Sequence, residues 1–326
     1  MSAEPAIAAA ARLAACDAAL RRVVHPLPGA RPWDNRRPLN MRAAHDRWCL
    51  LDVLLARFPQ IAAAEWESRC AAGRFVNQRG NICGSDYRVR AGEQVYQIFP
   101  LEIEPPVATD IRVVYEDEAV MLVNKPAPLP MHPSGRFHRN TLQHFLKLAF
   151  APQLLRPVHR LDSNTSGLVL FARTRHCCHL LQRQFIAGRV DKRYLVRVTG
   201  HPPDDRFFST AAIAAAPAVL GTRRIDEQSG QAARTDFQVI KRHADGTALL
   251  EAVLGSGRTN QIRLHLWHLG HAVVGDPAYL TGGRMGDTQT LALASPALQL
   301  HAWQLAFHHP LSGEPLSFTT ARPAWA

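Results

Sequence analysis

One carboxylate and one guanidinium stand two residues apart in the segment 159–167, which reads His-Arg-Leu-Asp-Ser-Asn-Thr-Ser-Gly. The segment continues into the apolar run 168–172, so we expect a polar turn that leads into a buried strand. On such a scaffold the carboxylate of Asp162 can act as a nucleophile or as a general base. Taken alone, the same residues also fit a surface turn in which Asp162 accepts hydrogen bonds from its own backbone.

Four more blocks contain polar and aromatic residues that packing does not require. Tyr194 closes a Lys-Arg-Tyr block, and Arg263 closes the run Gly-Arg-Thr-Asn-Gln-Ile-Arg that starts at Gly257. The other two blocks are Asn-Lys-Pro at 124–126 with Met-His-Pro-Ser-Gly-Arg at 131–136, and Gly-Asp-Pro-Ala-Tyr at 275–279. An arginine can keep a nearby carboxylate ionised in a dry pocket, and a tyrosine offers a flat face for a nucleobase.

In order and spacing these blocks resemble the RluA-like family of RNA pseudouridine synthases. Its signature is His-Arg-Leu-Asp-x-x-Thr-Ser-Gly-Leu, then Lys-x-Tyr, then Gly-Arg-Thr-x-Gln-Ile-Arg. The resemblance covers residues from about Ile111 to Phe318. It implies isomerisation of uridines in structured rRNA or tRNA, in which the base leaves the sugar, turns and rejoins it through C5, with no metal and no cofactor. One departure is Asn260, where the family commonly has histidine.

The resemblance also assigns the catalytic roles. Asp162 becomes the essential carboxylate, either as a nucleophile on the sugar or the base, or as a base at C2′ of the sugar. Arg263, in the first turn of a helix expected to open near Thr259, would hold Asp162 in its ionised form. Tyr194 would stack on a flipped-out uracil with its hydroxyl near C5, the alternative being simple packing in a strand.

Six further residues are expected to contact the substrate: Arg160, His159, Leu264, Lys125, His132 and Arg136. Arg160 would fill the gap that the flipped nucleotide leaves or hold a phosphate, and so offset part of the flipping cost of a few kcal/mol. Lys125, His132 and Arg136 are expected at the RNA backbone or the rim of the pocket. Leu264 either walls the pocket or fills the core.

The elements expected around these residues indicate an α+β protein. Periodicity predicts strands at 111–115, 119–123, 168–172, 190–198, 235–243, 248–254, 301–307 and 316–318. It predicts helices that begin at Asn140 or Thr141, at about Thr174, and near Thr259. Because helices interrupt the strands irregularly, α+β is favoured over a doubly wound sheet. The resemblance adds a pseudouridine synthase fold with a mixed, mainly antiparallel central sheet and flanking helices.

The N-terminal third suggests a small module ahead of this domain. We expect a partly disordered arm over 1–47, in which a short Ala-rich helix precedes a tether rich in proline, arginine and asparagine. An S4-like α/β module over 48–100, a linker over 101–110 and the catalytic domain over 111–326 should follow. The module resembles the S4-like RNA-binding domain loosely, since its Gly-Arg-Phe-Val-Asn stretch at 73–77 is shorter than the usual motif. Arginines interleaved with aromatic residues indicate RNA contact, and the resemblance points to Arg69, Arg74 and Arg79.

Composition agrees with a nucleic-acid partner. Lysine and arginine number 38 against 27 acidic residues, giving a net charge of +11 and a pI near 10.0. Such a chain favours polyanions, although basic chains also occur without binding any. The six cysteines contain no C-x-x-C pair, and no apolar run is long enough to span a membrane. We therefore expect a soluble, cytoplasmic protein, and the resemblance favours a monomer.

Two alternative functions remain open at this stage. A catalytically silent RNA-binding or ribosome-assembly factor could use the same basic cleft. A metal-dependent RNA hydrolase could use the histidines at 265, 268, 271, 301, 308 and 309. These histidines lack a matched carboxylate or cysteine spacing, so we interpret them as core or surface residues and predict no metal site.

Overall fold

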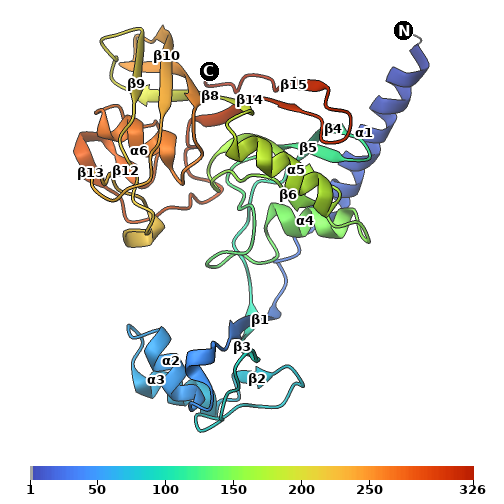
Figure 1. The fold of residues 1–326 in the computed structure, drawn as a ribbon, viewed down its shortest axis with the longest axis vertical. Helices are drawn as coiled ribbons and strands as arrows, with labels where there is room; N and C mark the ends of the chain where they lie inside the picture. Colours follow the sequence, from blue (N-terminus) through green and yellow to red (C-terminus); the bar gives the residue numbers. More distant parts are fainter. Residues whose placement is uncertain (1–2) are drawn as a thin grey trace. The chain divides into compact units, whose positions relative to one another are not determined.

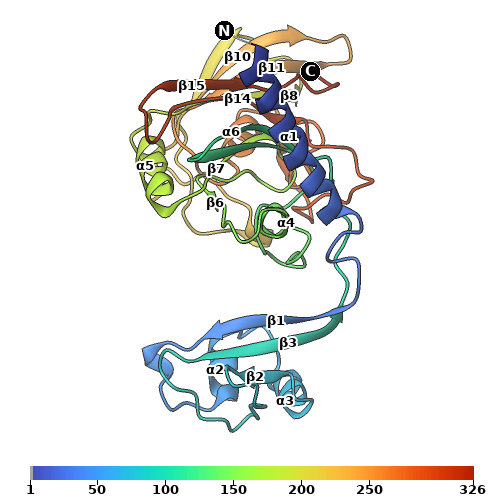
Figure 2. The ribbon, with the colours of Figure 1, turned by 90° about the vertical axis from the view of Figure 1, so that its right-hand side faces the viewer.

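The computed structural model describes residues 3–326, which form two compact units. The larger unit contains the residues up to Pro28 and resumes at Glu104, and the smaller unit is Gly29–Ile103. The predicted Ala-rich helix is confirmed, but residues 1–47 do not form one separate arm, because they are divided between the two units. Helix α1 (Ala3–Val24) buries Leu20 and Val24 in the core of the larger unit, whereas strand β1 (Trp33–Asn40) belongs to the smaller one (Figures 1 and 2).

The smaller unit is an α/β module. Its sheet has the order β1-β3-β2, with β3 spanning Gln94–Glu102 and β2 spanning Phe75–Asn77. Helices α2 (Leu50–Arg57) and α3 (Ala63–Ala71) pack on this sheet, and a short 3-10 turn covers Ala43–His45. Trp66 and Phe75 are almost fully buried in its core.

The larger unit is built on one mixed sheet with the strand order β4-β5-β7-β14-β8-β11-β10-β9. In that order the strands are Arg112–Glu116, Val120–Lys125, Ser166–Ala172, Leu300–His308, Asp191–Thr199, Thr247–Leu254, Thr235–Arg242 and Arg206–Ser209. Strand β15 (Pro315–Thr319) pairs with β14, and β6 (Arg156–Pro157) with β7. Among these pairs β7 and β14 run parallel and the others antiparallel. The predicted α+β class and the mainly antiparallel sheet are confirmed.

Alternation along β7 shows that the sheet has a core on each face. Leu168 and Leu170 pack in one cluster with Cys177 of α5 (Arg175–Ile186), whereas Val169 and Phe171 pack in the other with α4 (Leu142–Ala149). Thr141 and Thr174 cap these helices through their hydroxyl oxygens, as serine and threonine do at helix starts. A third helix, α6 (Gln261–His268), follows the β10–β11 hairpin. The remaining short elements are η2 (Val219–Gly221), β12 (Tyr279–Leu280), η3 (Thr281–Gly283) and β13 (Arg284–Met285).

Over residues 3–326, no helix has both the length and the apolar character that crossing a bilayer requires.

The loop before β7 is placed by a very close approach of two strands. Gly167 has a φ of +113° and lies beside Ala302 of β14, where a Cβ atom would be 2.2 Å from the Ala302 carbonyl oxygen. Only glycine fits this contact. The glycine of the 159–167 segment therefore allows the polar loop to end where β7 meets β14.

Candidate active site

Asp162 lies on a loop that neighbouring backbone groups hold in place. The amide of Thr165 donates to the Asp162 carbonyl over 3.1 Å, which closes the turn. The amide of Leu129 donates to the carbonyl of Ser163 over 2.9 Å, which ties the loop to the segment after β5. The Asp162 side chain keeps 23% of its surface exposed, so the carboxylate faces a cavity and is not sealed in the core.

Lys125 stabilises the same loop from inside the core. It does not lie at the rim of the pocket, so the prediction that it contacts the RNA backbone or the rim is wrong. Its side chain is fully buried, and Nζ donates to the carbonyls of Pro126, Leu129 and Ser163 over 3.0, 2.9 and 3.1 Å. Burial lowers the pKa of Lys125 to about 7, although the charge of Asp162 opposes this shift. Lys125 thus holds the loop of Asp162 in place by binding backbone carbonyls, and its buried ammonium is not placed to contact RNA.

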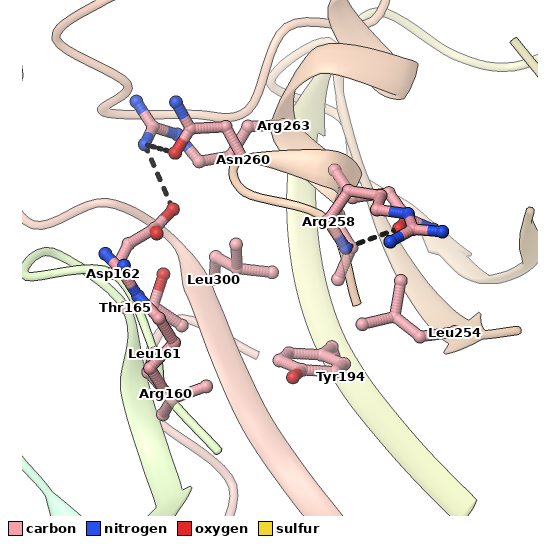
Figure 3. Close-up of a pocket in the computed structure, with 12 residues that line it drawn as sticks. Arg160, Leu161, Asp162, Thr165, Tyr194, Leu254, Arg258, Asn260, Arg263 and Leu300 are labelled. Atoms are coloured by element: carbon pink, nitrogen blue, oxygen red, sulfur yellow. Dashed lines mark hydrogen bonds and ion pairs between the residues drawn. The ribbon is translucent and has the colours of Figure 1, made fainter. Parts of the chain in front are cut away.

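Arg263 forms the predicted ion pair with Asp162. Its Nη1 lies 3.3 Å from Asp162 Oδ2, and the side chain is 2% exposed (Figure 3). Burial is the largest single influence and opposes the charge of Arg263, but the hydrogen bonds to Asp276 and the charges of Asp276 and Asp162 together outweigh it and raise the pKa of Arg263 above its usual range. The guanidinium therefore remains charged beside the carboxylate.

Asp276 is the strongest partner of Arg263, and our sequence reasoning assigned it no role. Nε and Nη2 of Arg263 donate to its two oxygens over 2.7 and 2.8 Å, and the Asp276 side chain is 0% exposed. The same carboxylate also accepts from the amides of Ala278 and Tyr279. Two parallel bonds of this kind fix the plane of a guanidinium. The Gly-Asp-Pro-Ala-Tyr block was the available signal.

The start of α6 is shaped by its own polar residues. Asn260 has a left-handed φ of +58°, accepts from Arg263 Nη1 over 3.2 Å, and donates through Nδ2 to the Tyr279 hydroxyl over 3.3 Å. Gln261 accepts from Ser256 and donates to Thr235 Oγ1 on β10. These bonds account for the polar residues between Gly257 and Arg263, since they orient the helix that carries the arginine.

Tyr194 projects from β8 into the cavity that Asp162 faces (Figure 3). Its cross-strand neighbours are Ala252 on β11 and Ala302 on β14. Because both side chains are small, they do not cover the ring of Tyr194. The apolar walls of this first cavity include Leu254, Ile262 and Leu300. Burial, followed by the charge of Asp162, raises the pKa of Tyr194, so the phenol stays neutral. The structure brings the predicted set of Asp162, Tyr194 and Arg263 together.

Arg160 and His132 also lie where a substrate could meet them. Arg160 is exposed and lines both the first cavity and a second one that adjoins it at Asp162. His132 lines the second cavity, and burial together with the charge of Arg160 lowers its pKa. Arg136 is exposed and its guanidinium lies 5.5 Å from the Phe137 ring, outside the residues that line either cavity.

His159 and Leu264 serve the core and do not line either cavity, so their predicted substrate contacts are corrected. His159 Nε2 accepts from the Leu170 amide over 3.1 Å, and its ring stacks on Phe185 of α5. Burial lowers the pKa of His159 to about 3, which keeps the imidazole neutral. Leu264 is fully buried in a cluster with Tyr279.

Four of the six histidines that could suggest a metal, His265, His271, His301 and His309, have protein partners. His265 contacts Thr235 Oγ1 and the Ala211 carbonyl, and His301 contacts the hydroxyls of Ser166 and Thr320. Within residues 3–326 no three histidine, cysteine or acidic side chains gather in a way that could hold an ion.

In the smaller unit the three predicted arginines have different settings. Arg69 pairs with Glu65 one helical turn away, and its guanidinium lies 4.8 Å from the Trp66 ring centre. Arg74 is half-buried and Arg79 is exposed.

A carboxylate paired with a buried arginine, in a partly apolar cavity that a tyrosine also lines, is the arrangement expected of a pseudouridine synthase. Comparison with known proteins agrees, because the sequence profile of the family described as RNA pseudouridylate synthase matches residues 119–268. The chain belongs to the RluA-type RNA pseudouridine synthases, a family of isomerases.

Three relatives illustrate the match. Ribosomal large subunit pseudouridine synthase D of Nitrosomonas europaea is 36% identical over 222 residues, which are 66% of this chain and 63% of that protein. This chain therefore spans less than two thirds of that relative. Dual-specificity RNA pseudouridine synthase RluA of Salmonella typhi is 34% identical over 66% of this chain and 94% of its own length. Among solved structures, human RNA Pseudouridylate Synthase Domain Containing 1 superposes with a TM-score of 0.55 at 28% identity, covering 68% of this chain and 87% of its own.

Proposed function

We propose that this protein isomerises uridine to pseudouridine within structured RNA, and that Asp162 is its essential carboxylate. In this reaction the N1–C1′ bond breaks, the C5–C1′ bond forms, a proton leaves C5 and N1 gains one. The uridine keeps all its other atoms, so one carboxylate suffices. The observation that carries the proposal is the ion pair of 3.3 Å between Asp162 and Arg263, which opens into the cavity lined by Tyr194.

Each of the three residues has a defined task in this reaction. Asp162 attacks the sugar or base, or removes a proton at C2′. Arg263 keeps that carboxylate charged in a partly buried setting. Tyr194 supports the flipped uracil with its ring, and its neutral hydroxyl lies toward C5, where it can accept the departing proton while it passes its own proton to water. Arg160, exposed at the mouth, takes the gap left in the RNA or a nearby phosphate.

The substrate we propose is ribosomal RNA, by analogy with the name of the Nitrosomonas relative. A transfer RNA is the second candidate, since the Salmonella relative is described as having dual specificity. We further propose that the protein acts as a monomer in the cytoplasm. The Gly29–Ile103 unit is proposed to be an S4-like module that adds RNA affinity through Arg69, Arg74 and Arg79.

The direct test is release of tritium from RNA labelled at C5 of uridine. Wild-type protein should release tritium, whereas Asp162→Asn should release none and still bind RNA. Asp204→Asn, a change of the same type at an exposed position, is the matched control and should retain full activity. Turnover by Asp162→Asn at the wild-type rate would refute the assignment of Asp162, whereas RNA binding by the wild type with no tritium release would favour a silent RNA-binding role.

Mapping of pseudouridine in total RNA from cells with and without the gene would identify the substrate. Loss of one or more sites in ribosomal RNA is the expected result. Loss confined to transfer RNA would correct the substrate, and no loss in any RNA would refute the function.

A further inference from the structure

A second and larger cavity adjoins the first one at Asp162 and is not lined by Tyr194. Its volume is about 260 Å³, and it shares Arg160, Leu161, Asp162, Asn260 and Arg263 with the first cavity. Isomerisation of one uracil uses Asp162 and the Tyr194 side of the site. The reaction as proposed therefore leaves the second cavity without an assigned ligand.

The walls of this second cavity combine flat apolar surface with neutral polar groups. Met131, Phe137 and Leu220 supply the apolar part. His132 is neutral, because burial and the charge of Arg160 lower its pKa, so its ring offers one donor and one acceptor. Surfaces of this composition suit a nucleobase, which has two apolar faces and a polar edge.

Two polar groups in the wall have no partner. Gln289 Nε2 and Ser163 Oγ are buried and make no hydrogen bond within residues 3–326, although both residues line the cavity. Buried polar groups are nearly always hydrogen-bonded, so such groups beside a cavity indicate a missing ligand or water. An amide donor and a hydroxyl can bind the edge of a base.

The segment that carries Gln289 is fixed to the catalytic loop. Asn164, 1% exposed, donates through Nδ2 to the Gln289 carbonyl over 2.7 Å and accepts from the Leu291 amide over 3.1 Å. These two hydrogen bonds resemble those between neighbouring strands. They fix the backbone of the segment that carries Gln289 to the loop that carries Asp162.

The charges in the cavity disfavour a phosphate. Arg263 is already paired with Asp276 and Asp162. Among the described residues that line the cavity, Arg160 is then the remaining arginine that could pair with a phosphate. A phosphate inside would also lie near the Asp162 carboxylate, and like charges repel. A neutral ring is the better occupant.

We propose that the second cavity binds the base of a nucleotide next to the target uridine in the same RNA, and that the Gln289 side chain reads its edge. This inference rests on the proposed function, because it assumes that a uridine occupies the Tyr194 side. It gives the enzyme a source of sequence preference that the catalytic residues cannot supply.

The test uses the full-length protein and the RNA segment identified by pseudouridine mapping. Each neighbour of the target uridine is replaced by the other bases and by an abasic nucleotide, and kcat/KM is measured by tritium release. Gln289→Ala removes an amide without a partner and leaves the backbone contact to Asn164. Gln182→Ala, at an exposed position on α5, is the matched control.

We expect replacement of the neighbour on one side by another base to lower kcat/KM of the wild type and of Gln182→Ala by about tenfold, the effect of one lost hydrogen bond to a buried group. Gln289→Ala should be about as slow on the native RNA as the wild type is on the RNA with the replaced base, and should not respond to that replacement. The abasic nucleotide should slow all three proteins, because it also removes the contacts with the apolar walls. Equal wild-type rates on all neighbours would overturn the inference and leave the proposed function standing. An equal loss by Gln289→Ala on every RNA, with the response to base replacement retained, would assign the cavity to the target nucleotide itself. Absence of any modified uridine would refute both proposals.

Discussion

Removing the Asp276 carboxylate should reveal how much the active site depends on a residue that cannot touch the substrate. Its two oxygens accept two bonds from Arg263 and two from backbone amides, and neither side chain is more than 2% exposed. Asp276→Ala leaves the buried guanidinium with its 3.3 Å contact to Asp162 and the Asn260 oxygen. Breaking a buried pair in this way costs about 3–5 kcal/mol of folding free energy. A guanidinium freed to shift by an ångström would also slow turnover by about 100-fold.

The loss of folding free energy is measured by urea unfolding followed by circular dichroism, in the transition of the larger unit. The control is Asp205→Ala, which removes an Asp–Arg contact of 2.7 Å to Arg242. Asp205 is 79% exposed, so its loss should stay within the about 1 kcal/mol typical of surface pairs. A loss of less than about 1 kcal/mol for Asp276→Ala, or losses equal in the two variants, would refute the reasoning.

Three other substitutions probe the site and its scaffold. Tyr194→Phe should keep RNA affinity and lose mainly kcat, whereas Tyr194→Ala should also weaken binding; identical effects on KM would contradict a stacking role. Gly167→Ala should prevent folding of the larger unit, because its methyl group would meet the Ala302 carbonyl at 2.2 Å; a soluble, cooperative variant would disprove the close contact. Burial lowers the pKa of His301 to about 4, so the unfolded chain binds a proton that the folded one excludes between about pH 6.5 and 4. The free energy of unfolding should therefore decrease as the pH is lowered through that window, by at most about 1.4 kcal/mol per pH unit for this site. His301→Gln should reduce this pH dependence, measured by urea unfolding at several pH values.

The predictions that succeeded came from local patterns. The strands of the sheet followed from alternation and turn residues, and the helix caps from threonines ahead of apolar periods. Asp162, Tyr194 and Arg263 met in one cavity because a motif carries residues that act together even when they are far apart in sequence.

The predictions that failed depended on distant contacts. Lys125 looked like a surface cation, and only the fold shows three carbonyls converging on its ammonium. His159 is adjacent to Arg160 in sequence but points to the other side, toward Phe185. The Ala-rich helix was expected, but it was assigned to a separate arm because its apolar partners on β4 and α4 come more than 80 residues later along the chain.

The insertion of the smaller unit between α1 and β4 has a consequence for how the chain folds. Trp33 is paired with Glu102 on adjacent strands, so the polypeptide enters and leaves this unit at neighbouring points. Once the unit has folded, the gap between α1 and β4 behaves entropically as a short loop, because the cost of closing a loop depends on its free length. Folding of the smaller unit therefore lowers the entropic cost of bringing together Val24 and Val107, which lie in one core. If the smaller unit folds first, the chain entropy lost on assembling the larger unit is smaller than for a free loop of the same number of residues.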